Sequence, residues 1–300
     1  MIETHPRAAE LTAWLAADDR PEVLRAVRDL RWTAIPGGAV NLRARISGRV
    51  DTETRYWFVR FAGRGSETLG ARLGAEAVAH AAAAAAGLAP ALVHVDLDRG
   101  ILLSDWWPSR PWTWRGARRD LAALGGWAAR LHALPAPRGL PPLDPLVAAR
   151  QLVAPLHGAR DPGQRELGRH LGDVLGRLSP ALPLLAAEPA LVHSDLHAAN
   201  LLRGRDGTVR AVDFEYAGAG PPCHDLAVFA SYHDLAPLHR RELLGAYAVA
   251  GGLTPGLEEF AEWCRLADVV WLSWTVRVAG AAWRTVPRAE RVAKRLTAVS

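Results

Sequence analysis

The sequence predicts an α+β protein of two lobes, a small β-rich N-terminal lobe over residues 1–104 and a larger, mainly helical C-terminal lobe over residues 113–300. Runs of β-branched and aromatic residues are concentrated in the N-terminal lobe, which is typical of strands. Stretches with apolar residues three or four positions apart dominate after residue 113 and predict helices. Residues 105–112 are too rich in proline and tryptophan for a regular element, so we expect a hinge there.

The N-terminal lobe is expected to begin with helices and continue as strands. Residues 7–29 predict two short helices, the second starting at Pro21, because proline is favoured in the first turn of a helix. Glycine and polar residues separate the next apolar runs, which predict strands at 31–35, 40–46 and 55–61. A long helix over 69–86 is expected to end at Gly87. Two further strands are expected at 91–95 and 101–104.

The C-terminal lobe is expected to be helical apart from one island of short strands. The periodicity of its apolar residues predicts helices at 118–134, 164–178, 235–250, 256–280 and 287–298. The strands are expected at 190–193, 201–203 and 209–213. No internal repeat is visible, which argues against a repeat architecture.

The composition is that of a packed globular protein. Half of the residues are hydrophobic and 22% are charged, and no apolar run is long enough to span a membrane. The net charge is +5, but the basic residues are scattered, which argues against nucleic-acid binding. Cys223 and Cys264 are too few for a disulfide framework, and residues 1–5 lack the pattern of a signal peptide. We therefore expect a cytoplasmic protein that binds neither nucleic acid nor membrane.

Two residue types are nearly absent, and the places where they occur are informative. Lys294 is the only lysine among 36 Lys and Arg residues, and Asn41 and Asn200 are the only asparagines. The abundance of Ala, Arg, Leu and Gly indicates a drift in composition caused by coding bias. A depleted residue that is still present therefore suggests that its chemistry is needed at that position.

The strongest chemical signal is the stretch 191–202, Leu-Val-His-Ser-Asp-Leu-His-Ala-Ala-Asn-Leu-Leu, which Asp213 follows after a turn. Phosphoryl transfer needs a carboxylate near the attacking hydroxyl and oxygen ligands for the Mg²⁺ that bridges the phosphates of ATP. Asp195 is the candidate catalytic carboxylate, and Asn200 and Asp213 are the candidate Mg²⁺ ligands. His193 is expected to brace the backbone of the loop rather than to react.

A hydrolytic metal site is the competing interpretation of the same stretch. His193, Asp195 and His197 alternate as metal ligands on a strand do. No further cluster of histidine and aspartate with suitable spacing completes such a site, so phosphoryl transfer is favoured. A polar loop with incidental carboxylates is disfavoured too, because the pattern lies between two predicted strands and a second aspartate follows it.

Residues 191–225 resemble the aminoglycoside phosphotransferase and choline kinase superfamily, whose members share the protein-kinase-like fold. The stretch 212–218, Val-Asp-Phe-Glu-Tyr-Ala-Gly, is most similar to choline and thiamine kinases, in which such a run stands where protein kinases have Asp-Phe-Gly. In the stretch 221–227, which also matches, Asp225 is expected to hold the catalytic loop from a helix start. The resemblance covers residues 30–280 and implies an ATP- and Mg²⁺-dependent kinase with a two-lobed, protein-kinase-like fold.

The resemblance extends to the nucleotide-binding side of the N-terminal lobe. Gly37 and Gly38 resemble the Gly-Gly turn of these kinases, where glycine lets backbone amides approach phosphates, and Asn41 completes that motif. Arg60 is expected to be the cation on the third strand that contacts phosphate, and Glu76 the helix carboxylate that positions it.

The hinge is expected to contact the adenine of ATP, mainly through backbone groups of Asp105 and Trp106. The stretch 109–111, Ser-Arg-Pro, departs from the commoner Gly-Arg-Pro of the superfamily, so the resemblance does not imply the geometry of this loop.

The acceptor is expected to bind among the C-terminal helices, as it does in this superfamily. Trp271 and Trp274 are three residues apart and therefore share a helix face, although tryptophans at helical spacing also form cores. Tryptophan faces bind quaternary ammonium and thiazolium cations. Glu215 and Tyr216 are further candidate substrate-binding residues. These residues favour a small cationic alcohol, such as thiamine or choline, as the hydroxyl acceptor.

Two alternatives remain open. An aminoglycoside acceptor calls for several carboxylates, which Glu258, Glu259 and Glu262 could supply, or these could form a solvated helix face. A catalytically inactive scaffold that binds nucleotide is a second alternative, although every catalytic part named above is present. The sequence leaves open which hydroxyl is phosphorylated, whether GTP replaces ATP, and the oligomeric state.

Overall fold

The structure, a computed structural model, describes residues 6–36, 41–63, 72–178, 182 and 189–297. Contacts between backbone positions divide the chain into two compact units. The first unit contains Met1–Pro111 and Leu202–Tyr216, and the second contains Trp112–Leu201 and Ala217–Ser300. The chain therefore leaves the first unit, returns to it for one short segment, and leaves it again.

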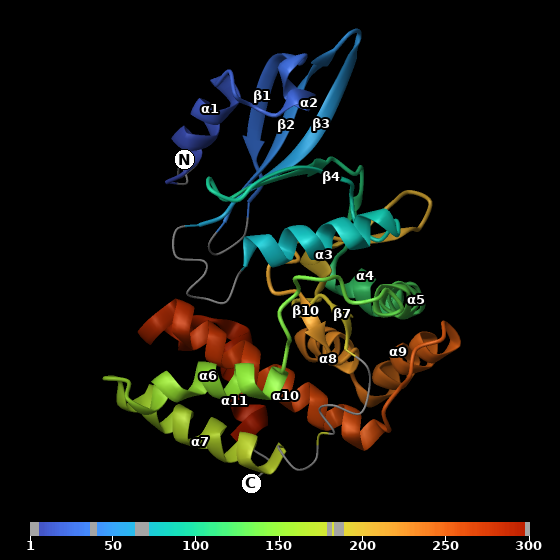
Figure 1. Ribbon diagram of the computed structural model, residues 1–300. Coiled ribbons are helices and arrows are strands. Elements are labelled where there is room, and N and C mark those ends of the chain that lie inside the picture. The colour runs from blue at the N-terminus through green and yellow to red at the C-terminus, as the bar shows by residue number, and fades with distance from the viewer. Residues whose placement is uncertain (1–5, 37–40, 64–71, 179–181, 183–188, 298–300) are drawn as a thin grey trace. The chain divides into compact units, whose positions relative to one another are not determined.

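The first unit is built on a five-stranded antiparallel sheet with the strand order β1-β2-β3-β5-β4 (Figure 1). Its strands are β1 Arg28–Ala34, β2 Leu42–Val50, β3 Glu53–Phe61, β4 Leu92–Asp96 and β5 Ile101–Asp105. β2 and β3 form a hairpin in which Leu42 lies opposite Phe61 and Val50 opposite Glu53. Asp51 in its tight turn has a φ of 53°, a left-handed conformation that aspartate adopts more readily than most residues. The five strands of the sheet overlap the five strands that the sequence predicts in this lobe.

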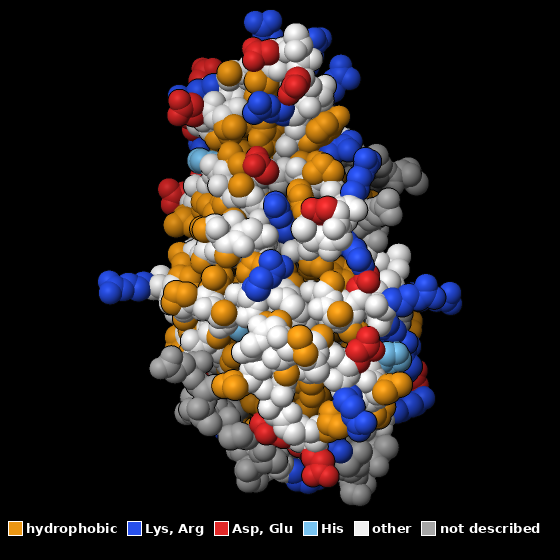
Figure 2. Space-filling model, turned by 90° about the vertical axis from the view of Figure 1, so that its right-hand side faces the viewer, with side chains coloured by type: hydrophobic (Ala, Val, Ile, Leu, Met, Phe, Trp, Pro, Cys, Tyr) orange, Lys and Arg blue, Asp and Glu red, His pale blue; other side chains and the backbone are white. Residues whose placement is uncertain are grey.

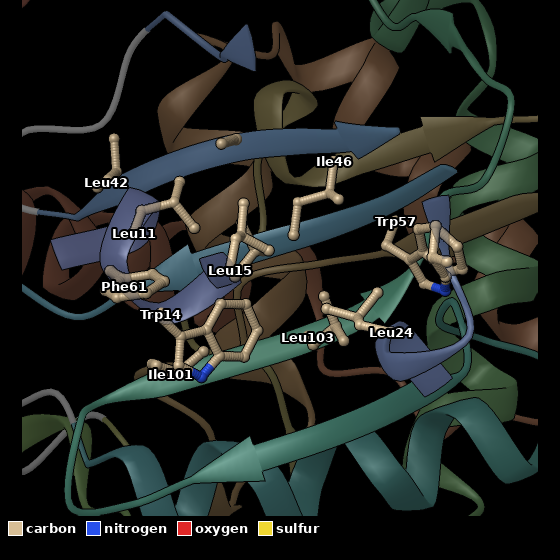
Figure 3. Close-up of a cluster of buried hydrophobic side chains, with 13 residues drawn as sticks. Leu11, Trp14, Leu15, Leu24, Leu42, Ile46, Trp57, Phe61, Ile101 and Leu103 are labelled. Atoms are coloured by element: carbon tan, nitrogen blue, oxygen red, sulfur yellow. The ribbon is translucent and has the colours of Figure 1, made fainter. Parts of the chain in front are cut away.

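Two short helices, α1 Ala8–Ala16 and α2 Glu22–Arg25, cover one face of this sheet. Figure 3 shows Leu11, Trp14 and Leu15 of α1 and Leu24 of α2 pointing at side chains of the strands. The Trp14 ring meets the Phe61 ring edge-on, with centroids 5.8 Å apart. The alternation of side chains along β3 places Phe61 in this cluster and directs Arg60 to the opposite face of the sheet.

The opposite face of the sheet is covered by α3 Leu73–Ala85, whose Glu76 pairs with Arg60. The returning segment 202–216 packs in the same unit. At its start, β8 Leu201–Arg203 forms a small sheet with β9 Val209–Ala211 and β6 Arg110–Pro111, in the order β6-β8-β9. The amide of Ala211 donates a 2.8 Å hydrogen bond to the Leu88 carbonyl, just beyond α3. These bonds explain why the segment belongs with the first unit, whereas the lobe boundaries expected from the sequence place it with the helices.

The second unit is mainly helical. Its helices are α4 Trp114–Arg119, α5 Leu121–His132, α6 Pro145–His157, α7 Pro162–Leu178, α8 Cys223–Tyr232, α9 Pro237–Val249, α10 Leu257–Ala279 and α11 Pro287–Thr297. The long helix α10 contacts α6, α7, α8 and α11, so it forms the centre of the unit. α5 and α9 pack so closely that a Cβ on Gly125 would come within 2.7 Å of Ala246. Two short antiparallel strands, β7 Ala190–Val192 and β10 Gly218–Gly220, complete the unit.

The sequence-based assignment missed α6. Its start carries an ordinary signal, because Asp144 caps it by accepting hydrogen bonds from the amides of Leu146 and Val147, and Pro145 occupies its first turn. Two features hid the helix: it follows a proline-rich stretch, and Pro155 lies inside its last turn. Proline has no amide hydrogen to donate, so Pro155 removes one backbone hydrogen bond from the last turn.

Among the described residues, no helix combines the length and the apolar character needed to cross a membrane. On the face drawn in Figure 2, Lys and Arg side chains are interspersed with Asp, Glu and hydrophobic side chains. This distribution matches the scatter of basic residues along the sequence.

Candidate active site

The catalytic loop predicted at 193–200 leaves β7 and ends in a 3₁₀ turn over Ala198–Asn200. Ser194 has a φ of 67°, so the backbone turns sharply directly after His193. His193 is fully buried, and its Nδ1 accepts a 3.3 Å hydrogen bond from the amide of Asp195. The His193 ring therefore supports the backbone of the loop from within.

Asp225, in the first turn of α8, fixes the backbone of this loop. Its two carboxylate oxygens accept hydrogen bonds from the amides of His193 (2.7 Å) and Ser194 (2.6 Å). His132 of α5 lies 3.1 Å from Oδ2 of Asp225, and the other ring nitrogen of His132 is 2.9 Å from the Tyr247 hydroxyl. Burial acts to raise the pKa of Asp225, but the hydrogen bonds and charges of His132 and His193 together lower it below its ordinary value.

Asp195 presents a carboxylate with one oxygen engaged and one free. Asn200 donates from Nδ2 both to the Asp195 carbonyl (3.0 Å) and to Asp195 Oδ2 (2.9 Å). Nε2 of His197 lies 3.4 Å from the same Oδ2. Oδ1 has no hydrogen-bond partner among the described residues, and the side chain is 33% exposed. Burial acts to raise the pKa of Asp195, but His197, His193 and Asn200 lower it below its ordinary value.

His197 is oriented toward Asp195 by its other ring nitrogen. Nδ1 of His197 accepts a 3.2 Å hydrogen bond from the Ala199 amide, so this nitrogen carries no proton. The proton of the neutral ring is therefore on Nε2, which faces Asp195. No group of three or more His, Cys, Asp or Glu residues in the described part of the chain is arranged to hold a metal ion.

The first unit contains a second group of predicted residues, centred on Arg60. Arg60 forms an ion pair with Glu76 of α3, and both side chains are almost fully buried. Nη1 of Arg60 also lies 3.7 Å from Oε2 of Glu215. Burial lowers the pKa of Arg60, and the negative charges of Asp213 and Glu215 act against this. A buried guanidinium beside three carboxylates remains a cation.

Asn41 joins this group through Glu215. Its Nδ2 donates a 2.8 Å hydrogen bond to Oε2 of Glu215, and its Oδ1 accepts a 2.9 Å bond from the amide of Gly63. The sequence-based hypothesis placed Glu215 with the acceptor, whereas the structure gives it contacts with Asn41 and Arg60, both predicted to bind the nucleotide. Tyr216, half-buried, follows it in the same unit. Gly37 and Gly38 lie outside the described residues.

Asp213 lies in the returning segment with a φ of 68°. Its Oδ1 is buried and has no hydrogen-bond partner among the described residues. The next residue, Phe214, is fully buried with its ring 5.6 Å from the His80 ring of α3, which anchors the segment. A buried carboxylate oxygen without a partner is costly, and a bound cation satisfies it. Asp213 therefore fits the chemistry of a Mg²⁺ ligand.

The predicted hinge residues Asp105 and Trp106 follow β5 in the first unit. The amide of Asp105 donates to the Ala91 carbonyl (2.9 Å) and that of Trp106 to the Tyr56 carbonyl (3.2 Å). Both amides are thus used within the protein, and the Asp105 carbonyl accepts a 3.5 Å hydrogen bond from the Ser104 hydroxyl. A cavity of about 360 Å³ adjoins them, lined in part by Tyr56, Trp107 and Arg210. Its size lies in the range of small-ligand pockets.

Trp271 and Trp274 lie on α10 and are both half-buried. The guanidinium of Arg288 from α11 lies 3.9 Å from the Trp271 ring centroid, so this ring already has a cation on one face. Nε1 of Trp274 is buried without a hydrogen-bond partner among the described residues.

Several residues around the loop were not predicted from the sequence, namely His132, Tyr247, Tyr232, Arg288 and His233. They come from helices that are distant in the sequence from the loop, and no short motif marks them. His233 illustrates the point, since its Nε2 accepts a hydrogen bond from the Ala198 amide (3.1 Å).

Comparison with known proteins decides the family. Residues 31–263 match the APH family, described as the phosphotransferase enzyme family. The chain belongs to this family. A comparison with curated proteins found no match to this phosphotransferase.

Solved structures similar to this phosphotransferase have the kinase-like fold. One is a choline/ethanolamine kinase family protein from Mesorhizobium loti, with 23% identity, a TM-score of 0.72, and coverage of 97% of this chain and 93% of that chain. Another is the choline kinase LicA from Streptococcus pneumoniae, with 18% identity, a TM-score of 0.72, and coverage of 92% and 95%; LicA has also been solved with AMP. A third is an aminoglycoside-3'-phosphotransferase of type VIII, with 25% identity, a TM-score of 0.55, and coverage of 80% and 93%.

These findings confirm the superfamily, the α+β protein-kinase-like fold and the small-molecule kinase predicted from the sequence.

Proposed function

We propose that this phosphotransferase transfers the γ-phosphoryl group of Mg²⁺-ATP to a hydroxyl group of a small molecule. The observation that carries the proposal is the state of Asp195. One of its carboxylate oxygens is held by Asn200 and His197, and the other is free to accept a hydrogen bond from an acceptor hydroxyl. A carboxylate at that place orients the hydroxyl and accepts its proton as the oxygen attacks phosphorus.

The remaining residues supply the nucleotide site in this proposal. Arg60, positioned by Glu76, neutralises phosphate charge, and the turn at Gly37 and Gly38 offers backbone amides to the phosphates. Asn200 commits its amide nitrogen to Asp195, so its oxygen remains for a cation, and Asp213 has an unpartnered oxygen. These two residues would hold Mg²⁺, which neutralises charge on the phosphates when bound. The complex of LicA with AMP supports nucleotide binding by this fold.

The acceptor is a small-molecule alcohol in this proposal. The sequence favours a cationic alcohol such as thiamine or choline, and the similarity to choline kinases supports that choice. The Arg288 guanidinium on Trp271 counts against a quaternary ammonium group at that ring. An aminoglycoside is the second candidate, supported by the similar aminoglycoside phosphotransferase and by the carboxylates that begin α10. Phosphorylation of a small molecule by ATP fits the cytoplasmic location expected from the sequence.

The test is ADP release from Mg²⁺-ATP with a panel of acceptors that includes thiamine, choline, ethanolamine, kanamycin, a macrolide and a neutral alcohol. One acceptor should stimulate release well above the rate without acceptor. The Asp195→Asn variant should lose about 10²- to 10⁴-fold in kcat and keep its affinity for Mg²⁺-ATP. The exposed Asp98→Asn is the matched control and should retain full activity. Equal activity of Asp195→Asn and wild type would overturn the role of Asp195, and absence of Mg²⁺-ATP binding would overturn the kinase function.

A further inference from the structure

Arg288, near the start of α11, lies against two aromatic rings of the second unit. Its guanidinium carbon is 3.9 Å from the ring centroid of Trp271 on α10 and 4.7 Å from that of Tyr232 at the end of α8. Two aromatic faces at such distances form a binding site for a cation. We call Tyr232 and Trp271 the aromatic pair. Its cation site is filled by a side chain of the same protein.

Polar contacts explain only part of this placement. Nη2 of Arg288 donates a 3.1 Å hydrogen bond to the Ser231 hydroxyl and lies 3.7 Å from Oδ1 of Asp268. Nε and Nη1 are buried and have no hydrogen-bond partner among the described residues, and the side chain is 11% exposed. Burial lowers the pKa of Arg288 to about 10, so it remains a cation at neutral pH. The rings therefore provide much of what holds the guanidinium in place.

The aromatic pair adjoins the candidate catalytic loop. The Tyr232 ring stacks on the His197 ring, with centroids 4.5 Å apart and planes inclined by 18°. Nε2 of His197 lies 3.4 Å from Asp195 Oδ2. The aromatic pair is therefore joined to the candidate catalytic carboxylate by the stacked rings of Tyr232 and His197.

The charges around the pair do not favour a second cation. Asp268 accepts hydrogen bonds from Nε and Nη2 of Arg295, at 2.8 and 2.7 Å, and Asp234 accepts one from Nη1 of Arg295 at 2.8 Å. Arg291 lies 3.9 Å from the same Asp234. With Arg288, three guanidinium groups thus face two carboxylates. Asp268 is already neutralised and has no charge left to attract a cationic ligand.

We infer that Arg288 is a specificity-determining residue that closes the aromatic pair to quaternary ammonium groups, so that the acceptor carries no fixed positive charge there. The inference rests on the proposed kinase function and narrows its acceptor class away from choline- and thiamine-like alcohols. A ligand cation between the same rings would have to displace the guanidinium, or would meet a like charge in a site with little water, where repulsion is strong.

The first test compares choline with its neutral isostere, 3,3-dimethylbutan-1-ol, as acceptors. Both have the same shape, and only choline is charged. The wild type should show no preference for choline in kcat/KM, whereas Arg288→Ala should prefer choline by about tenfold, since the emptied pair gains a cation contact. The Arg291→Ala control removes the same charge from the same helix without touching the aromatic pair and should behave as wild type. A tenfold preference of the wild type for choline would overturn the inference.

The second test requires no turnover, so it separates this inference from the kinase function. Binding of tetramethylammonium is measured by calorimetry on the wild type, Arg288→Ala, Arg288→Lys and Arg291→Ala. We expect about tenfold tighter binding only in Arg288→Ala, because lysine keeps a cation on the pair. Equal affinity of Arg288→Ala and wild type would overturn the inference. Circular dichroism checks that each variant is folded, and if Arg288→Ala is not, the choline comparison on the wild type remains decisive.

Discussion

Asn41 donates a 2.8 Å hydrogen bond to the carboxylate of Glu215, 174 residues further along the sequence. The same carboxylate lies 3.7 Å from Arg60, and the other end of the Asn41 amide accepts from the Gly63 backbone. One asparagine side chain therefore ties together β2, the end of β3 and the returning segment. Asparagine is rare in this sequence, and the Asn41 side chain acts here both as donor and as acceptor.

Asn41→Leu should weaken nucleotide binding more than it weakens acceptor binding. The substitution removes the acceptor of the Gly63 amide and one hydrogen-bond donor of the Glu215 carboxylate, at a cost of about 1–3 kcal/mol for each lost bond. We expect KM for ATP to rise about tenfold or more, with KM for the acceptor nearly unchanged. Glu215→Gln keeps an oxygen for Asn41 and serves as the matched variant. A rise in KM for the acceptor alone would show instead that Glu215 belongs to the acceptor site.

Asp213→Gly should abolish the stabilisation by Mg²⁺-ATP without destabilising the protein alone. Glycine adopts the φ of 68° without strain, and the unpartnered buried oxygen disappears. Asp213→Ala also lacks the carboxylate but is strained at this φ by about 1–2 kcal/mol. Thermal unfolding with and without Mg²⁺-ATP compares them. Both variants should lose the ligand-induced shift, and only the alanine variant should melt earlier without ligand; a normal shift in either one would exclude Asp213 as a metal ligand.

Asp225→Asn should destabilise the protein by about 3–5 kcal/mol, because it breaks the buried pair with His132. The substitution also replaces one carboxylate oxygen with an NH₂ group, so one of the two backbone amides that Asp225 binds loses its acceptor. Urea unfolding at pH 7 measures the change. Asp173→Asn, an exposed aspartate on α7, is the control and should shift the free energy of unfolding by less than about 0.5 kcal/mol. A similar small effect at Asp225 would show that the loop is held by other contacts.

Stability should fall as the pH drops from 6.5 to about 4, because two buried histidines are held neutral. Burial lowers the pKa of His224 to about 4 and that of His233 to about 3. Between these values and the ordinary pKa near 6.5, the unfolded chain binds protons that the folded chain does not, so unfolding becomes easier as the pH falls. The slope approaches about 1.4 kcal/mol per pH unit for each histidine.

The contacts of His233 explain why it must stay neutral. Its Nε2 accepts the Ala198 amide and cannot do so once protonated. His233→Gln should reduce the slope of unfolding free energy between pH 5 and 6.5, and the exposed His157→Gln should leave it unchanged. An unaltered slope in His233→Gln would mean that other groups govern the pH dependence.

The fold was largely predictable because its strands and most of its helices carry local signals. The alternation in β2 and β3 and the long apolar periodicity of α10 depend on residues close together in the sequence. The helix α6 was missed because nearby prolines outweighed its Asp144 cap. The membership of residues 202–216 in the first unit was not predictable, since the Ala211–Leu88 bond joins positions more than a hundred residues apart.

The candidate site also contains residues that the sequence predicts and residues that it does not. Asp195, Asn200 and Asp213 are candidates because of the spacing of one motif, and Asp225 is a candidate because of the family resemblance of residues 221–227. Their surroundings could not be read from that motif, because His132, Tyr247 and Arg288 come from separate helices and contribute through packing. Two contacts depend on the three-dimensional structure alone: Glu215 lies beside Asn41, and a cation lies on Trp271. Both change which residues are candidates for binding the acceptor.

The return of residues 202–216 to the first unit has a consequence for biosynthesis. During translation, the five-stranded sheet emerges from the ribosome long before the strands β8 and β9 that complete its unit. The first unit therefore cannot finish folding as an N-terminal fragment, although N-terminal domains usually fold first. We expect a nascent chain stalled at residue 111 to remain sensitive to protease, and resistance to arise only after residue 216 has left the exit tunnel.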